Sequence, residues 1–307
     1  MHLSVMLQET VDALAVRPGG CYIDGTLGSA GHAMEILKRT GVTGRLLGID
    51  RDPEALKRSK ERLSEVPGTV CLAHGAHGDL YRIAKENGFE LVDGILLDLG
   101  VSSDQLDTPE RGFSFRLDGP LDMRMDPTQG ESAADVVAGA GEHELATLFW
   151  RLGEEKQSRR IARVIVKARA DGAIRTTAQL ADLVSQAVGG KKGPRHPATR
   201  VFQALRMHVN REIEQLEQAL EGGLKLLKPG GRFAVITFES LTDRIVKHAF
   251  AAHVGVWRSL QQGGEAWSGT LPAAEWVTRH AGVPTEAELE VNPRARSAKL
   301  RVILRKE

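Results

Sequence analysis

Hydrophobic and polar positions in the first hundred residues follow two alternating patterns, short apolar runs and longer stretches with helical spacing. Apolar runs at residues 21–23, 45–49, 69–72 and 91–97 predict strands. Helical spacing predicts helices over residues 3–16, from the end of the glycine-rich turn at residue 32 to residue 38, and over residues 53–63. Proline opens the last of these. Strands that alternate with helices indicate an α/β fold whose parallel sheet has helices on both faces.

The alternation stops after residue 103 and resumes at about residue 212. Residues 104–211 carry several helical patterns and no β-rich run, whereas residues 232–238 and 298–304 again predict strands. The sequence therefore predicts a sheet domain made of residues 1–103 and 212–307. Residues 104–211 form an inserted, mostly helical domain.

Composition supports a folded chain of 307 residues, because 41% of them are hydrophobic and 26% are charged. The net charge of +1 excludes a uniformly basic nucleic-acid-binding protein. It hides a strong internal contrast, since residues 104–150 hold 3 Lys+Arg and 10 Asp+Glu, while residues 151–211 hold 14 and 4. These counts give net charges of −7 and +10, which agree with an insertion that has a basic half.

Several other classes of protein are also excluded. Cys21 and Cys71 cannot by themselves form a disulfide framework or a zinc site, so no metal is expected. No run has the length of a membrane helix. Glu9 and Asp12 soon follow Met1, without the apolar core of a signal peptide. We therefore expect a cytoplasmic protein with no membrane partner.

A glycine-rich turn follows the first strand and is the first candidate binding element. Gly25, Gly28 and Gly31 let the backbone approach a ligand, and the next helix offers its N-terminal N–H groups. Their spacing differs from that of dinucleotide-binding folds. Asp50, at the end of the second strand, stands where a carboxylate accepts ribose hydroxyls. NAD and S-adenosylmethionine both satisfy this pattern; a tight turn without ligand and a helix-capping role for Asp50 are the structural alternatives.

Three strands end on a carboxylate, at Asp24, Asp50 and Asp98. In open α/β sheets, ligands bind at the carboxyl ends of the strands. One aspartate there is commonly a helix cap, but three indicate a ligand that carries hydroxyls, an amine or positive charge. S-adenosylmethionine carries all three.

The insertion contains two further candidate elements. Residues 110–127 form a polar loop with aromatic and methionine side chains, which is either an ordered surface loop or a lid over a substrate base, held to the sheet domain by Arg–Asp pairs. A basic stripe then follows one helix face and favours phosphate contact over a merely solvated surface. Its members and the basic residues after it are Lys156, Arg159, Arg160, Arg163, Lys167, Lys191, Lys192, Arg195, His196 and Arg200.

Taken together, these motifs resemble the small-subunit ribosomal RNA methyltransferase H family, also called MraW. The resemblance runs nearly end to end and rests on residues 22–26, 31–32, 48–53, 93–103, 105, 111–115, 119–127, 196–200, 203–204, 240–241 and 243–247. It implies a class I, Rossmann-like S-adenosylmethionine-dependent methyltransferase domain with an inserted helical substrate-recognition domain. It also implies methylation of the N4 exocyclic amine of a specific cytidine in 16S rRNA, with 16S rRNA or the small ribosomal subunit as partner.

The resemblance assigns roles residue by residue. Cofactor contacts fall on Ala30, Gly31, His32, Asp50, His77, Asp98 and Gln105, and substrate contacts on Arg124, Arg159, Arg160, Arg163 and His196. Asp98 is the candidate catalytic residue, because a carboxylate is a natural acceptor for cytosine N4 protons; a backbone carbonyl in residues 99–102 is the alternative. Three positions depart from the family pattern. Ala30 replaces a glycine and requires negative φ, His77 replaces an aromatic residue, and Glu239 replaces a histidine.

Two other functions explain less of the sequence. An NAD-dependent oxidoreductase needs its own glycine spacing and a second nucleotide-binding half, and neither is found. A non-enzymatic RNA-binding module would leave three strand-end carboxylates idle beside a polyanion. The sequence leaves open the modified position, the choice between naked RNA and assembled subunit, and the oligomeric state, for which a homodimer is one alternative.

Overall fold

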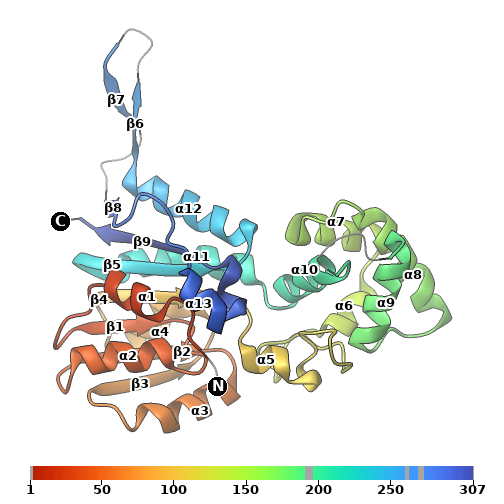
Figure 1. The fold of residues 1–307 in the computed structure, drawn as a ribbon, viewed down its shortest axis with the longest axis horizontal. Coiled ribbons are helices and arrows are strands. Elements are labelled where there is room, and N and C mark those ends of the chain that lie inside the picture. Colours follow the sequence, from red (N-terminus) through yellow and green to blue (C-terminus); the bar gives the residue numbers. More distant parts are fainter. Residues whose placement is uncertain (1–2, 191–195, 260–262, 269–272, 307) are drawn as a thin grey trace. The chain divides into compact units, whose positions relative to one another are not determined.

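The computed structural model describes residues 3–190, 196–259, 263–268 and 273–306. Its main sheet has seven strands in the order β3-β2-β1-β4-β5-β9-β8 (Figure 1). Their bounds, in chain order, are β1 (Cys21–Asp24), β2 (Arg45–Asp50), β3 (Thr69–His74), β4 (Val92–Asp98), β5 (Leu227–Thr237), β8 (Ala274–Trp276) and β9 (Lys299–Arg305). β1 to β5 pair in parallel, whereas β9 pairs antiparallel with β5 and with β8. The predicted α/β class is confirmed.

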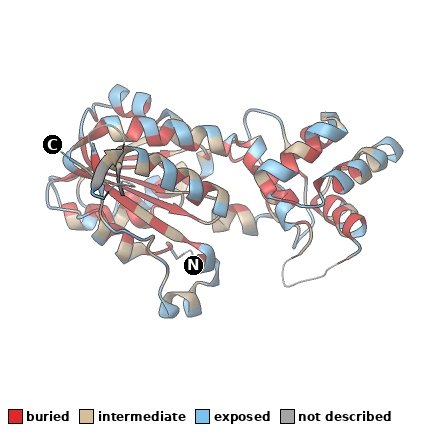
Figure 2. Cartoon of the chain, turned by 90° about the horizontal axis from the view of Figure 1, so that it is seen from above, coloured by how far each residue is buried: buried red, intermediate tan, exposed pale blue. Residues whose placement is uncertain are grey.

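Helices cover both faces of this sheet, as Figure 1 shows. They are α1 (Leu7–Ala13), α2 (Gly31–Thr40), α3 (Pro53–Leu63), α4 (Leu80–Glu86), α11 (Glu212–Leu226), α12 (Ser240–Val254) and α13 (Glu286–Val291), with short 3-10 turns η1 (His77–Asp79) and η3 (Pro293–Ser297). Side chains alternate across each strand, so that Ile95 and Leu97 join one core cluster and Leu96 joins the other. The strands are buried on both sides, while the helices bury only their inner faces (Figure 2).

The chain divides into two compact units, residues 1–100 with 213–307 and residues 101–212. The sequence placed these boundaries at 103/104 and 211/212. The second unit is helical and contains α5 (Ser103–Asp107), η2 (Pro109–Arg111), α6 (Ala133–Gly139), α7 (Glu142–Gly153), α8 (Ser158–Asp171), α9 (Thr177–Val188) and α10 (Thr199–Val209). It has a hydrophobic core of its own.

The loop predicted as a lid is built into the core of the helical unit. Leu121 and Met123 are 1% and 0% exposed. Asn210, itself buried, accepts a hydrogen bond from the Met125 N–H at 2.8 Å and donates to the Met123 carbonyl at 2.7 Å. Arg111 donates to the carbonyls of Arg124 and Met125. The loop therefore has a fixed conformation within this unit.

The first helix is shorter than predicted, because α1 begins only at Leu7. Met6 adopts φ 50°, a left-handed conformation that a helix cannot continue through, and its N–H donates to Glu288 Oε1 at 2.7 Å. Elsewhere, β6 (Val256–Ser259) and β7 (Glu265–Ser268) form a separate two-stranded hairpin. Among the described residues, no helix has the length and apolar character needed to cross a membrane.

Replacing Asn210 by alanine tests whether this side chain fastens the loop. Asn210→Ala removes the partners of two buried backbone groups, each worth about 1–3 kcal/mol when left unpaired, so we expect the free energy of unfolding to fall by at least about 2 kcal/mol. Urea unfolding measures the loss, and Glu131→Ala, at an exposed position after the same loop, serves as control. Equal stability of the two variants would contradict this role.

Candidate functional site

Two carboxyl groups meet at the carboxyl edge of the sheet because β1 and β4 are parallel neighbours. Asp24 ends β1 and is 1% exposed, and Asp98 ends β4 with its side chain 23% exposed. The Asp98 Oδ1 atom is buried and has no hydrogen-bond partner among the described residues. An unpartnered buried carboxyl oxygen indicates a position for a donor or cation that the chain does not supply.

The protonation of these carboxyls follows from their burial. Desolvation raises the pKa of Asp24 to about 7, and the charge of Asp50 adds to the rise. Desolvation likewise raises the pKa of Asp98 to about 8, with a further contribution from the charge of Asp24. Because burial penalises the ionised form, a cation placed here would stabilise the charged carboxylates and lower both pKa values.

Thr26 joins the two strand ends and was not among the predicted site residues. Its N–H donates to Asp24 Oδ1 at 3.1 Å, and its Oγ1 accepts from the Asp98 N–H at 2.6 Å. Thr26 therefore holds the carboxyl of Asp24 and the backbone of Asp98. The available signal was a hydroxyl residue two positions after a strand-end aspartate, where side chain and backbone commonly exchange hydrogen bonds.

Asp50 fastens the glycine turn to the end of β2. Its Oδ2 accepts from the Gly28 N–H at 2.7 Å and its Oδ1 from the Asp52 N–H at 2.8 Å. Gly28 has φ 52°, which a glycine adopts without strain. Burial raises the pKa of Asp50, although these two N–H groups oppose the rise. Each oxygen keeps a second acceptor direction, so the carboxylate can still bind ribose hydroxyls. The capping alternative is wrong, since Asp52 caps α3.

The turn after β1 corrects one expectation and places two predicted residues. Ala30 has φ 62°, not the negative value required of it, so its methyl group carries the strain of a left-handed residue. Gly31 opens α2 where a β-carbon would lie 1.8 Å from Ser4 Oγ. His32 Nε2 lies 3.0 Å from the Val5 carbonyl, which directs Nδ1 to within 3.8 Å of Asp98 Oδ2.

His77 lies beside the glycine turn, because a β-carbon on Gly25 would be 3.7 Å from the His77 Cβ. Its Nε2 is buried with no hydrogen-bond partner among the described residues. Desolvation, followed by the charge of Arg51, lowers the pKa of His77 to about 4, so the ring is neutral at pH 7. The Gln215 side chain accepts from the Gly78 N–H at 3.2 Å and holds the loop.

Two predicted residues of the helical unit have local structural partners. Gln105 Oε1 accepts from the Ser102 N–H at 3.1 Å, and the Ser102 side chain accepts from the Gln105 N–H, which makes a capping box for α5. Arg124 donates to both carboxyl oxygens of Asp122 at 2.9 and 2.6 Å. This Arg–Asp pair lies inside the loop, so the prediction that such pairs hold the loop to the sheet domain is wrong for Arg124. A cofactor role for Gln105 stays a prediction.

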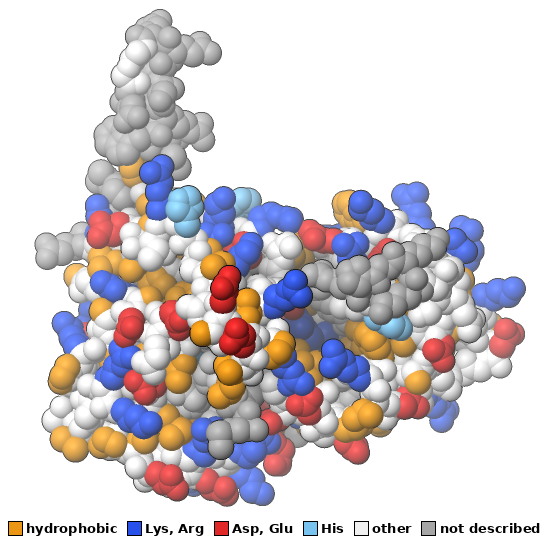
Figure 3. Space-filling view, viewed as in Figure 1, with side chains coloured by type: hydrophobic (Ala, Val, Ile, Leu, Met, Phe, Trp, Pro, Cys, Tyr) orange, Lys and Arg blue, Asp and Glu red, His pale blue; other side chains and the backbone are white. Residues whose placement is uncertain are grey.

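The basic stripe on α8 is only partly unpaired. Arg163 pairs with Glu142 at 3.4 Å while its side chain is 74% exposed, and its contact with substrate stays a prediction. Arg159 and Arg160 are exposed and pair with no described carboxylate. Figure 3 shows Lys and Arg side chains over this part of the helical unit. The His196 ring stacks on Phe115 with centroids 4.6 Å apart. Lys191, Lys192 and Arg195 lie outside the described residues.

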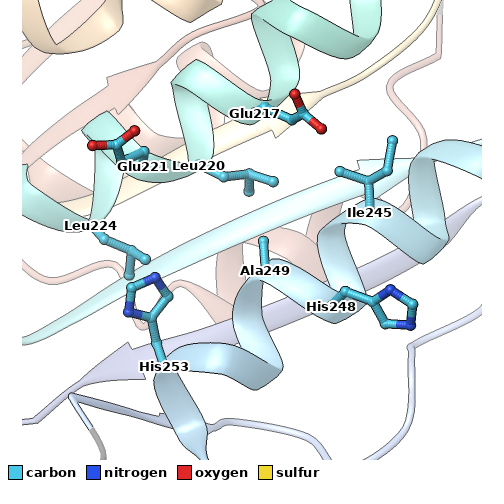
Figure 4. A pocket seen from close by; sticks show the side chains of 8 residues that line it. All are labelled: Glu217, Leu220, Glu221, Leu224, Ile245, His248, Ala249 and His253. Atoms are coloured by element: carbon cyan, nitrogen blue, oxygen red, sulfur yellow. The ribbon is translucent and has the colours of Figure 1, made fainter. Parts of the chain in front are cut away.

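The sheet unit also has a surface groove of about 370 Å³ between α11 and α12 (Figure 4). Leucine, isoleucine and alanine side chains form its floor, with glutamates on α11 and histidines on α12 at its rims. No predicted cofactor residue lines it. Glu239 lies just after β5, at the N-cap position of α12, and its side chain makes no capping hydrogen bond. The described residues contain no group of three or more His, Cys, Asp or Glu that could hold a metal ion.

The edge of the sheet thus combines buried carboxyls suited to a cation, a carboxylate suited to ribose, and a neutral buried imidazole. This set fits an adenosine cofactor that carries positive charge. A model of the MraW methylase family matches residues 1–306. The chain belongs to the MraW methylase family. This confirms the predicted family, the predicted enzyme class, a methyltransferase, and S-adenosylmethionine as its cofactor.

Curated relatives that share one name match nearly the whole chain. The ribosomal RNA small subunit methyltransferase H of Syntrophotalea carbinolica is 50% identical over 306 residues, which cover 99% of this chain and 98% of the relative. The proteins of the same name from Trichlorobacter lovleyi and Shewanella amazonensis are each 48% identical, over 98% of this chain and 96% of the relative.

Cofactor binding should release protons. The raised pKa values mean that Asp24 and Asp98 favour the fold below about pH 4, and that this contribution is lost as pH rises through 7 to 8. A bound cation drives both groups to ionise, so affinity for S-adenosylmethionine should rise between pH 6 and 8.5, by at most about tenfold per pH unit for each proton released. Calorimetry at pH 6.5 in buffers of different ionisation enthalpy counts these protons.

Asp98→Asn is the matched control for this measurement, because it keeps the shape of the side chain without its proton. It should release fewer protons and bind more weakly. Binding by the wild-type protein without proton release at pH 6.5 would contradict the assignment of the cation to this pair.

Proposed function

We propose that this chain transfers a methyl group from S-adenosylmethionine to the N4 amine of a specific cytidine in 16S rRNA. The name shared by its relatives supports this function, since they are ribosomal RNA small subunit methyltransferases H. The observation that carries it is the unpartnered carboxyl oxygen of Asp98 beside the glycine turn. A ribosomal substrate also supports a cytoplasmic location; a homodimer stays a prediction.

Different residues at the sheet edge contact different parts of the cofactor. Asp50 accepts the ribose hydroxyls, His77 contacts the adenine, and the carboxyls of Asp24 and Asp98 balance positive charge. Ala30, Gly31 and His32 bring the backbone of the turn close. When bound, S-adenosylmethionine supplies a methyl group already activated by its positive sulfur. The protein therefore has mainly to align the accepting amine with that methyl group.

The thiols argue against methylation of a pyrimidine ring carbon, which requires a thiolate nucleophile. Cys21 is buried at the start of β1, away from the carboxyl edge, and burial raises the pKa of its thiol. Cys71 lies inside β3, is partly exposed, and has its Sγ 3.2 Å from Asn87 Oδ1. Neither thiol lies at the carboxyl edge, so an exocyclic amine is the better acceptor.

Asp98 is the proposed acceptor for an N4 proton. Without a ligand its carboxyl is largely protonated at pH 7, because its pKa is about 8. A nearby cation lowers that pKa, so the carboxylate becomes ionised, and able to accept, only when the site is loaded. A backbone carbonyl in residues 99–102 is the alternative acceptor. The target base must leave its stack to be reached, and the Gly112–Asp126 loop is its proposed cover.

The product nucleoside tests the reaction. RNA from a strain that lacks the enzyme, incubated with the pure protein and S-adenosylmethionine and then digested, should contain N4-methylcytidine by mass spectrometry. Asp98→Asn should lower the turnover number by about 10²-fold or more, as expected for a lost proton acceptor. Appearance of 5-methylcytidine, or loss of activity in Cys71→Ser, would contradict this mechanism.

The basic stripe should supply phosphate contacts. Arg159→Glu with Arg160→Glu should weaken RNA binding and flatten its dependence on salt by roughly one unit or slightly less for each lost contact. Affinity for S-adenosylmethionine should stay unchanged. Lys57→Glu with Lys60→Glu, two exposed positions on α3, gives the same change in net charge elsewhere. If both double variants bind RNA equally well, the stripe is only a solvated face. Arg124, Arg163 and His196 stay predicted substrate contacts.

A further inference from the structure

We infer that Trp150 is a stacking platform for an unpaired base of the RNA substrate, an inference that rests on the proposed function. Trp150 lies on α7 and is 64% exposed. The opposite face of the same helix is fully used, since Leu145 and Phe149 are 0% exposed. The helix would be equally well packed without a large ring on its outer face, so the fold does not account for the tryptophan.

Several exposed basic residues belong to the end of α7 that carries this ring and to the segments that follow or contact it. The first turn of α10 lies beside the end of α7. Arg200 donates to the Glu154 carbonyl at 3.0 Å, and Gln203 donates to the Leu152 carbonyl at 3.4 Å. Exposed basic side chains occur at Arg151, Lys156, Arg159 and Arg160, within ten positions of Trp150 along the chain, and at Arg200, which contacts the end of α7. None of these five forms an ion pair with a described residue.

Two acidic residues, Glu154 and Glu155, stand among these basic residues. Glu155 is 9% exposed, and its Oε1 accepts from the Gln157 N–H at 2.8 Å. Its carboxylate is therefore used within the connection between α7 and α8. Glu154 is the exposed acid at the end of α7. One exposed acid thus stands against five exposed basic residues, so this end of the unit carries net positive charge as well as an exposed indole.

This combination matches single-stranded RNA better than a protein partner. Unpaired bases stack on aromatic rings without regard to sequence, while neighbouring cations hold the phosphates. An apolar protein partner would offer these cations no opposite charge and would desolvate any that it covered. Duplex RNA offers no exposed base face to Trp150. The ring should therefore select single-stranded segments.

Binding of RNA probes tests the platform. A mixed-sequence single-stranded RNA of twelve nucleotides should bind Trp150→Ala roughly tenfold more weakly than wild type, whereas Trp150→Phe should stay within about threefold. Trp150→Leu, which keeps an apolar side chain without a ring, should resemble Trp150→Ala. The salt dependence should not change, because no phosphate contact is lost, and affinity for S-adenosylmethionine should equal that of wild type.

Two results would overturn the inference while leaving the proposed function intact. One is equal affinity of wild type and Trp150→Ala for the single-stranded probe. The other is unchanged binding of naked RNA together with slower methylation of assembled small subunits, which would assign Trp150 to a ribosomal protein. If the wild-type protein neither binds nor methylates RNA, the proposed function fails, and the stacking role fails with it.

Discussion

The burial of two carboxyl groups at neighbouring strand ends is the constraint on which the site depends. Parallel pairing of β1 and β4 brings Asp24 and Asp98 to one edge, where desolvation holds both pKa values far above those of ordinary carboxyls. The fold thus bears an unfavourable arrangement that a cationic ligand relieves. Thr26 holds the carboxyl of Asp24 and the backbone of Asp98, and Asp50 connects the turn beside them to β2.

The same edge explains how one region can serve both binding and reaction. Under the proposed function, the carboxyl of Asp98 would be mostly a neutral acid in the empty site and would become an ionised proton acceptor beside the positive charge of the cofactor. The neutral His77 ring and the unpartnered Asp98 oxygen show that polar groups have been buried there without internal partners. Such groups cost stability, and the observation is most simply explained by a ligand that satisfies them.

The helical unit separates charges that nearly cancel in the whole chain. Many of its acidic side chains are used locally, as in the capping box of Ser132 with Asp135 and the pairing of Asp122 with Arg124. On α8 the balance differs, since only Arg163 of the predicted arginine triplet has a carboxylate partner. The acidic half therefore stabilises the structure of the unit, while the basic half leaves unpaired charge on its surface.

The sequence by itself determined the strand-end aspartates, the interrupted α/β pattern and the family, because polarity, period and motif spacing are local properties of the chain. It could not show that Ala30 is left-handed, that Gln105 caps α5, or that Arg124 binds within its own loop. Nor could the sequence show that β9 pairs antiparallel with β5. Only the tertiary structure decided these features, because each depends on which distant backbone and side-chain groups reach one another, and hydrophobic periodicity carries no information about that choice.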